Sequence, residues 1–133
     1  MKTSKRPVVK IIIIVLAVLI LGVTAFFLSP VGRSVVNKNA MNGLAEYSRY
    51  VSEDARYTVS VRDNSPAGLF GGVNLRVYLI DSESGRVSCC GDGRIDYYED
   101  FSSGVFFNED DNGITVSFNN KYSTHEIYVN KMR

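Results

Sequence analysis

The sequence has few of the residues that build metal sites or disulfide frameworks. Its 133 residues include one His, two Cys, three Pro and no Trp. The two cysteines, Cys89 and Cys90, are adjacent, which excludes a fold held by several disulfides. No zinc-ligand spacing occurs, so we predict neither a metal nor a cofactor. We expect the cysteines to be small apolar residues in or near a strand, with a strained disulfide between them or a pairing with another chain as the alternatives.

Acidic residues are missing from the N-terminal part of the chain. All 14 of them lie beyond residue 28, whereas four of the 15 basic residues, Lys2, Lys5, Arg6 and Lys10, lie in the first ten. The rest of the chain therefore has 15 − 4 = 11 basic residues against 14 acidic ones, a formal charge of −3. A mildly acidic domain with scattered charges argues against binding to nucleic acid or to an anionic lipid surface.

The run from Ile11 to Leu28 has no charge and almost no polar group. As a helix it would span roughly 27 Å, close to the hydrocarbon thickness of about 30 Å. Fourteen of its residues are Leu, Ile, Val or Phe, and their insertion free energies sum to about −6 kcal/mol. We predict a transmembrane helix over Ile11–Leu28 in the cytoplasmic membrane. The basic residues before it place the N-terminus inside and residues 29–133 outside.

A cleaved signal peptide is the alternative, which would leave a secreted protein. Signal peptides have an apolar stretch of about 7–15 residues and a cleavage site flanked by small residues. Here the stretch is longer, and its one candidate site, Val23-Thr24-Ala25, is followed by further apolar residues. The sequence therefore favours an uncleaved anchor.

We divide the chain into a basic leader (1–10), the membrane helix (11–28), a juxtamembrane linker (29–44) and one extracytoplasmic β domain (45–133). Pro30 and Gly32 end the membrane helix, and several Asn residues disfavour a second helix. A short helix over Val35–Leu44 is the alternative for the linker.

Beyond Tyr47, apolar and aromatic residues recur at every second position, as in the run from Val73 to Leu79. Turn-forming groups such as Gly91-Asp92-Gly93 separate these runs. We predict a mainly β fold, an antiparallel meander of about six or seven strands in a sandwich or partial barrel. A type I′ turn at Asn112-Gly113 would place Phe107 opposite Phe118.

Several segments resemble one group of proteins when they are taken in order. Val51–Val59 (VSEDARYTV) looks like the "SPDGKYTV" hairpin opening of small, uncharacterised, membrane-anchored bacterial proteins. Gly71–Asp81 resembles their long second strand. Gly113–Phe118 and His125–Val129 resemble their closing strands. The resemblance implies a β fold in the cell envelope and brings no activity.

Candidate chemical sites are few. His125-Glu126 is the one conceivable acid–base pair, but adjacent side chains on a strand point to opposite faces, so we predict no catalytic residue. Asp92–Asp96 and Glu109–Gly113 superficially resemble calcium loops but lack the EF-hand pattern, so we predict solvated turns, with weak cation binding as the alternative. Leu69 and Phe70 lie between glycines and a proline. They either cover an open end of the sheet or form a partner-binding tip.

These observations predict a non-enzymatic binding domain anchored on the outer face of the membrane, with an envelope protein as its partner. An immunity- or inhibitor-type protein is the first alternative. A minimal hydrolase that uses scattered carboxylates is the second. A cavity with two facing carboxylates, or with His125 beside an acid, would favour the hydrolase.

Overall fold

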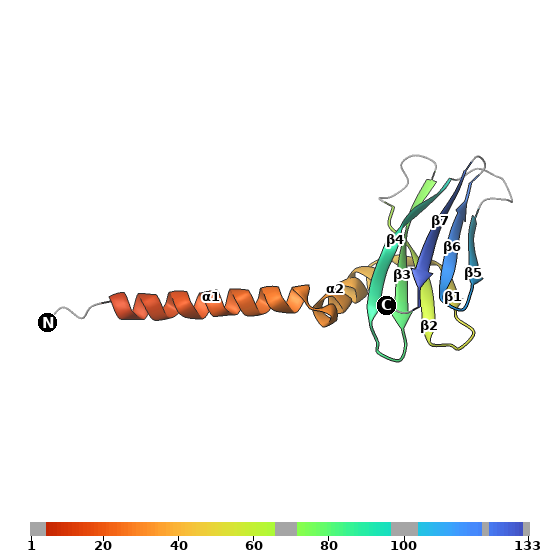
Figure 1. Ribbon diagram of the computed structural model, residues 1–133. Helices are drawn as coiled ribbons and strands as arrows, with labels where there is room; N and C mark the ends of the chain where they lie inside the picture. Colours follow the sequence, from red (N-terminus) through yellow and green to blue (C-terminus); the bar gives the residue numbers. More distant parts are fainter. Residues whose placement is uncertain (1–4, 66–71, 97–103, 121–122, 132–133) are drawn as a thin grey trace.

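The computed structural model describes residues 5–65, 72–96, 104–120 and 123–131 (Figure 1). These residues form two helices followed by seven strands. The helices are α1 (Arg6–Leu28) and α2 (Pro30–Asn42). The strands are β1 (Ala45–Val51), β2 (Tyr57–Asp63), β3 (Gly72–Asp81), β4 (Val87–Asp96), β5 (Gly104–Glu109), β6 (Gly113–Asn119) and β7 (Thr124–Asn130).

Helix α1 projects away from the β domain (Figure 1). It has 23 residues, and none of them is buried. Its Leu, Ile, Val and Phe side chains are therefore exposed around its whole circumference, which water does not stabilise. The helix lies near the N-terminus and is long and apolar enough to cross a membrane.

A single extended residue, Ser29, separates the two helices. Its hydroxyl accepts a hydrogen bond from the Gly32 N–H (3.1 Å) and so caps the start of α2. Gly32 packs so closely against α1 that a Cβ there would lie 1.8 Å from the Phe26 carbonyl oxygen. The apolar helix thus ends at Leu28, the predicted position, and Gly32 is what allows the second helix to begin at once.

Residues 29–44, which we predicted to be a linker, are mostly the helix α2. The helix packs on the outer face of the first sheet, where Met41 joins a small core with Tyr78 and Val87. Its polar side chains also bind the edge of β4: the Ser34 hydroxyl accepts from the Val87 N–H (2.8 Å), and the Asn37 amide donates to the Val87 carbonyl (3.2 Å). This packing stabilises a helix that propensity alone disfavours.

The strands form two antiparallel sheets, with the orders β1-β2-β3-β4 and β5-β6-β7. The predicted meander is confirmed, and the two sheets face each other as a sandwich. Alternating residues of both sheets supply the core. Its buried members are Tyr57, Val59, Val61, Val73, Leu75, Val77, Leu79, Ile95, Ile114, Val116, Phe118 and Val129.

The hairpin between β5 and β6 differs from the prediction. Phe107 pairs with Val116 and not with Phe118, a shift of two residues. The Asp110 N–H bonds the Gly113 carbonyl (2.9 Å), and the Asp110 carboxylate accepts from the N–H of Asn112 and of Gly113 (both 2.7 Å). The turn is therefore centred one residue earlier, because the Asp110 side chain binds its backbone amides.

Gly91-Asp92-Gly93, which we predicted to be a turn, lies inside β4. A Cβ on Gly93 would approach the Phe118 ring to 2.6 Å, and one on Gly91 would lie 3.1 Å from Ile127. These glycines let β4 come close to the second sheet. Their role is to make space and not to reverse the chain.

The two cysteines lie in β4, as expected. Val77 pairs with Gly91 and Tyr78 with Cys89, so Cys90 is the extra residue of a β-bulge. Cys89 is exposed, whereas Cys90 is half-buried and packs against the core. Both residues are described, and no disulfide joins them.

Candidate functional site

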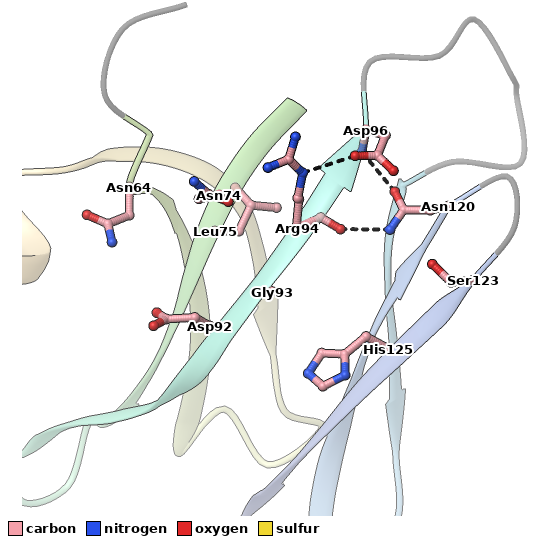
Figure 2. A pocket seen from close by; sticks show the side chains of 10 residues that line it. All are labelled: Asn64, Asn74, Leu75, Asp92, Gly93, Arg94, Asp96, Asn120, Ser123 and His125. Atoms are coloured by element: carbon pink, nitrogen blue, oxygen red, sulfur yellow. Dashed lines mark hydrogen bonds and ion pairs between the residues drawn. The ribbon is translucent and has the colours of Figure 1, made fainter. Parts of the chain in front are cut away.

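A cleft of about 680 Å³ opens at one end of the sandwich (Figure 2). It lies where β2 and β4 end and where β3 and β7 begin, so residues distant in the sequence line it together. Polar side chains predominate among them. The lining residues are Asn64, Asn74, Leu75, Asp92, Gly93, Arg94, Asp96, Asn120, Ser123 and His125.

Asn120 holds one wall of the cleft in place. Its amide donates to the Arg94 carbonyl (2.9 Å) and accepts from the Asp96 N–H (2.8 Å). One side chain at the end of β6 thereby binds the edge of β4, which belongs to the other sheet (Figure 2). The bidentate contact fixes the spacing between the sheets at the cleft.

The charged groups of the cleft are arranged in pairs. Asp96 lies 3.0 Å from the Arg94 guanidinium, and Asp92 lies 2.8 Å from that of Arg76. The hydrogen bond from Arg76 to the Asp92 carboxylate raises the pKa of the Arg76 guanidinium. Each carboxylate therefore has a cationic neighbour, and the formal charges around the cleft nearly balance.

Four side chains leave hydrogen-bonding groups open to a ligand. The amides of Asn64 and Asn74, the Ser123 hydroxyl and the His125 ring have no hydrogen-bond partner among the described residues. Asn74, Ser123 and His125 are exposed, and Asn64 is half-buried. Together these four side chains offer both hydrogen-bond donors and hydrogen-bond acceptors at the opening of the cleft.

His125 and Glu126 diverge, as predicted. The His125 ring lies beside the Phe118 ring, with 6.3 Å between their centroids. Glu126 points to the other face of β7, where its carboxylate accepts from the Ser117 hydroxyl (3.4 Å). His125, Asp92 and Asp96 line the same cleft, and the described residues show no hydrogen bond between the ring and either acid.

The other predicted sites have different outcomes. Leu69 and Phe70 lie outside the described residues, although Asn64 and Asn74 on either side of that segment line the cleft. Glu109 and Asp110, from the second calcium-like segment, bind Lys131 and the turn amides. Within the described ranges, no group of three or more His, Cys, Asp or Glu residues is placed to hold a metal.

Our sequence reasoning missed the asparagines of the cleft. Asn64 and Asn120 each follow the last residue of a strand, and Asn74 lies near the start of the next one. In an antiparallel meander these positions gather at the same end of the domain. The position of these asparagines at strand ends could have indicated the cleft. Asparagine near a strand end, however, is usually interpreted as an ordinary turn residue.

Comparison with known proteins found no match to this chain among protein-family models, curated proteins or solved structures.

Proposed function

We propose that this protein is a membrane-anchored binding domain. Helix α1 crosses the cytoplasmic membrane, the β sandwich lies on its outer side, and the cleft binds a polar segment of an envelope protein. The observation that carries the proposal is the set of open hydrogen-bonding groups on Asn64, Asn74, Ser123 and His125, gathered beside the Asn120 contact that fixes the cleft walls.

The contacts in the cleft favour binding over hydrolysis. A general base must lie about 2.6–3.2 Å from the group whose proton it removes. Asp92 and Asp96 instead accept from arginines, and the His125 ring lies against Phe118. Paired carboxylates and an amide-rich wall suit recognition of peptide groups, because each amide offers both a donor and an acceptor.

The anchor supports this role through the rigid attachment of α2. Ser34 and Asn37 bind the backbone of Val87, and Met41 is buried against the sheet. Only Ser29 is extended between the two helices. The sandwich is thus held close to the end of α1, and tethering to the membrane raises its effective concentration near other envelope proteins.

Site-specific photocrosslinking in intact cells tests the proposal on the full chain. A photoreactive phenylalanine analogue replaces Asn74 or Ser123, which are exposed in the cleft, or Phe106, which is 49% exposed on β5 and serves as the control. We expect one discrete protein adduct from positions 74 and 123 and none from position 106. We further expect Asn64→Ala to weaken the adduct.

Equal adducts at all three positions would contradict a binding cleft, because the capture would then reflect general proximity. Absence of any adduct at positions 74 and 123, with the protein present at its normal level in the membrane fraction, would also overturn the proposal.

A further inference from the structure

Two adjoining grooves lie between α2 and the turn that joins β3 to β4. Their volumes are about 380 and 390 Å³, and Ser34 and Arg86 line both of them. Arg33 lines the first groove and Lys38 the second. Neither groove is lined by a carboxylate among the described residues. Their charged lining is thus entirely basic.

These three cations differ from the others of the domain. The side chains of Arg33, Lys38 and Arg86 have no ion-pair or hydrogen-bond partner among the described residues. Each of the other described cations beyond residue 42 has an acceptor. The pairs are Arg49 with Glu46, Arg56 with Asp81 and Glu83, Arg62 with Ser60 and the Leu44 carbonyl, Arg76 with Asp92, Arg94 with Asp96, and Lys131 with Glu109.

The grooves also lie directly beside the end of the apolar helix. Helix α2 starts two residues after Leu28, so the segment from Val31 to Lys38 covers only about 12 Å along the helix axis. The interfacial layer on each side of the hydrocarbon core is about 5–8 Å thick. Val31 and Val35 are 55% and 44% exposed next to the basic residues. Apolar and basic side chains together are typical of helices that lie in this layer.

We propose that these grooves bind the phosphate groups of anionic phospholipids in the bilayer that α1 crosses. This proposal rests on the proposed membrane anchoring. Arginine donates two parallel hydrogen bonds to a phosphate, and Arg33 and Arg86 approach the first groove from a helix and from a turn. Because Ser34 and Asn37 bind the backbone of Val87, the next residue after Arg86, the chain at Arg86 is held against α2, and both arginines line the first groove.

The formal charge of −3 on residues 29–133 predicts no attraction to an anionic surface. Charges act over about 10 Å in 0.1 M salt, so the groups nearest the bilayer decide the interaction and not the total. Here the partnerless cations line the grooves beside α2, whereas Glu83, the carboxylate of the same turn, is paired with Arg56 (3.1 Å).

Hydrogen exchange of the full chain in nanodiscs tests this proposal. We compare nanodiscs of phosphatidylcholine with nanodiscs of an equal mixture of phosphatidylcholine and phosphatidylglycerol. The expected result is a several-fold slowing of exchange in α2 and in residues 84–87 when phosphatidylglycerol is present. The double variant R33Q/R86Q should lose this slowing. The control R49Q/R94Q, which removes the same charge from residues that pair with Glu46 and Asp96, should keep it.

The outcomes separate the two proposals. If α1 itself exchanges rapidly in both nanodiscs, the anchoring proposal fails. If α1 is protected but phosphatidylglycerol has no effect on α2, the anchor stands and the headgroup site is wrong. If R49Q/R94Q also loses the slowing of exchange, the slowing depends on the total charge of the domain and not on the grooves, and the headgroup site is wrong. Protection by inorganic phosphate in pure phosphatidylcholine would assign the grooves to free phosphate and overturn the lipid proposal.

Discussion

Gly93 of β4 lies directly against the ring of Phe118 in β6. A Cβ built on Gly93 would be 2.6 Å from three carbon atoms of that ring, far inside contact distance. Phe118 is fully buried between the sheets. The absence of a side chain at position 93 therefore allows the edge strand β4 to close over the core, and it also leaves the cleft open at this point.

The substitution Gly93→Ala should destabilise the β domain, because the added methyl group forces β4 and the Phe118 ring apart. Overpacking of this kind costs about 1–3 kcal/mol. Urea unfolding of the full chain in detergent micelles, followed by circular dichroism in the β-sheet region, measures the change. The neighbour Asp92 is exposed, so Asp92→Asn should stay within about 0.5 kcal/mol of wild type. An unchanged midpoint for Gly93→Ala would show that the sheets adjust freely.

Gly93 also shows where the sequence misleads. The period-two run from Val73 to Leu79 lies in a strand, as predicted, because alternation reports burial of one face directly. Glycine is different, since the same residue permits a turn and permits close packing. Phe118, the contact that decides between these two meanings, is 25 residues farther along the chain. Local patterns therefore placed Gly91-Asp92-Gly93 in a turn.

For helix α2 the sequence offered only a short helix over Val35–Leu44 as an alternative to a linker, whereas the helix covers Pro30–Asn42, and the cleft was not predicted. Both differences have a related reason. The helix depends on Met41 contacting Tyr78 and on Ser34 contacting Val87, both long-range contacts. The cleft depends on Asn120 reaching the backbone of β4 across the two sheets. Such contacts follow from the order and the register of the strands. The sequence indicated antiparallel neighbours but not how the two sheets face each other.

The ion pair of Glu109 should make the stability of the β domain depend on pH in the acid range. Its carboxylate accepts hydrogen bonds from the Lys131 ammonium (2.7 Å) and the Tyr50 hydroxyl (2.9 Å) at the end of the sandwich opposite the cleft. The bond from Lys131 holds the pKa of Glu109 below its ordinary value, although desolvation opposes this. A carboxyl with a lowered folded-state pKa adds stability above its unfolded value, about 4.3, and that stability is lost as the pH falls through the folded value.

Glu109→Gln should therefore lower the thermal unfolding midpoint at pH 7 and change it much less at pH 3. Thermal melts of wild type and variant across this range measure the difference. Glu126→Gln is the matched control, since Glu126 is exposed on the outer face of β7 and lies far from Lys131. An equal loss at both pH values would mean that Glu109 acts through packing and not through its charge.

The Ser34 hydroxyl should protect one particular amide. It accepts the hydrogen bond of the Val87 N–H, which lies on the edge of β4 that has no neighbouring strand. In Ser34→Ala this N–H loses its partner, so its exchange with solvent should accelerate at least several-fold, while amides in the middle of β2 stay slow. Residue-resolved hydrogen exchange measures this. Asn39→Ala, which changes an exposed residue of the same helix that lines neither groove, should leave the exchange of the Val87 N–H unchanged. Equal acceleration in both variants would point to general loosening of α2.

Cys89 provides the test of orientation. It is exposed on β4, whereas Cys90 is half-buried against the core, so a maleimide should modify Cys89 much faster. With the sandwich outside the membrane, a membrane-impermeant maleimide should label the Cys90→Ser variant in intact cells. Cys89→Ser, the control, should react mainly after denaturation. Labelling that requires cell lysis would place the domain in the cytoplasm. A labelled product in the medium, shortened near Ala25, would show that α1 is a cleaved signal and that the domain works without an anchor.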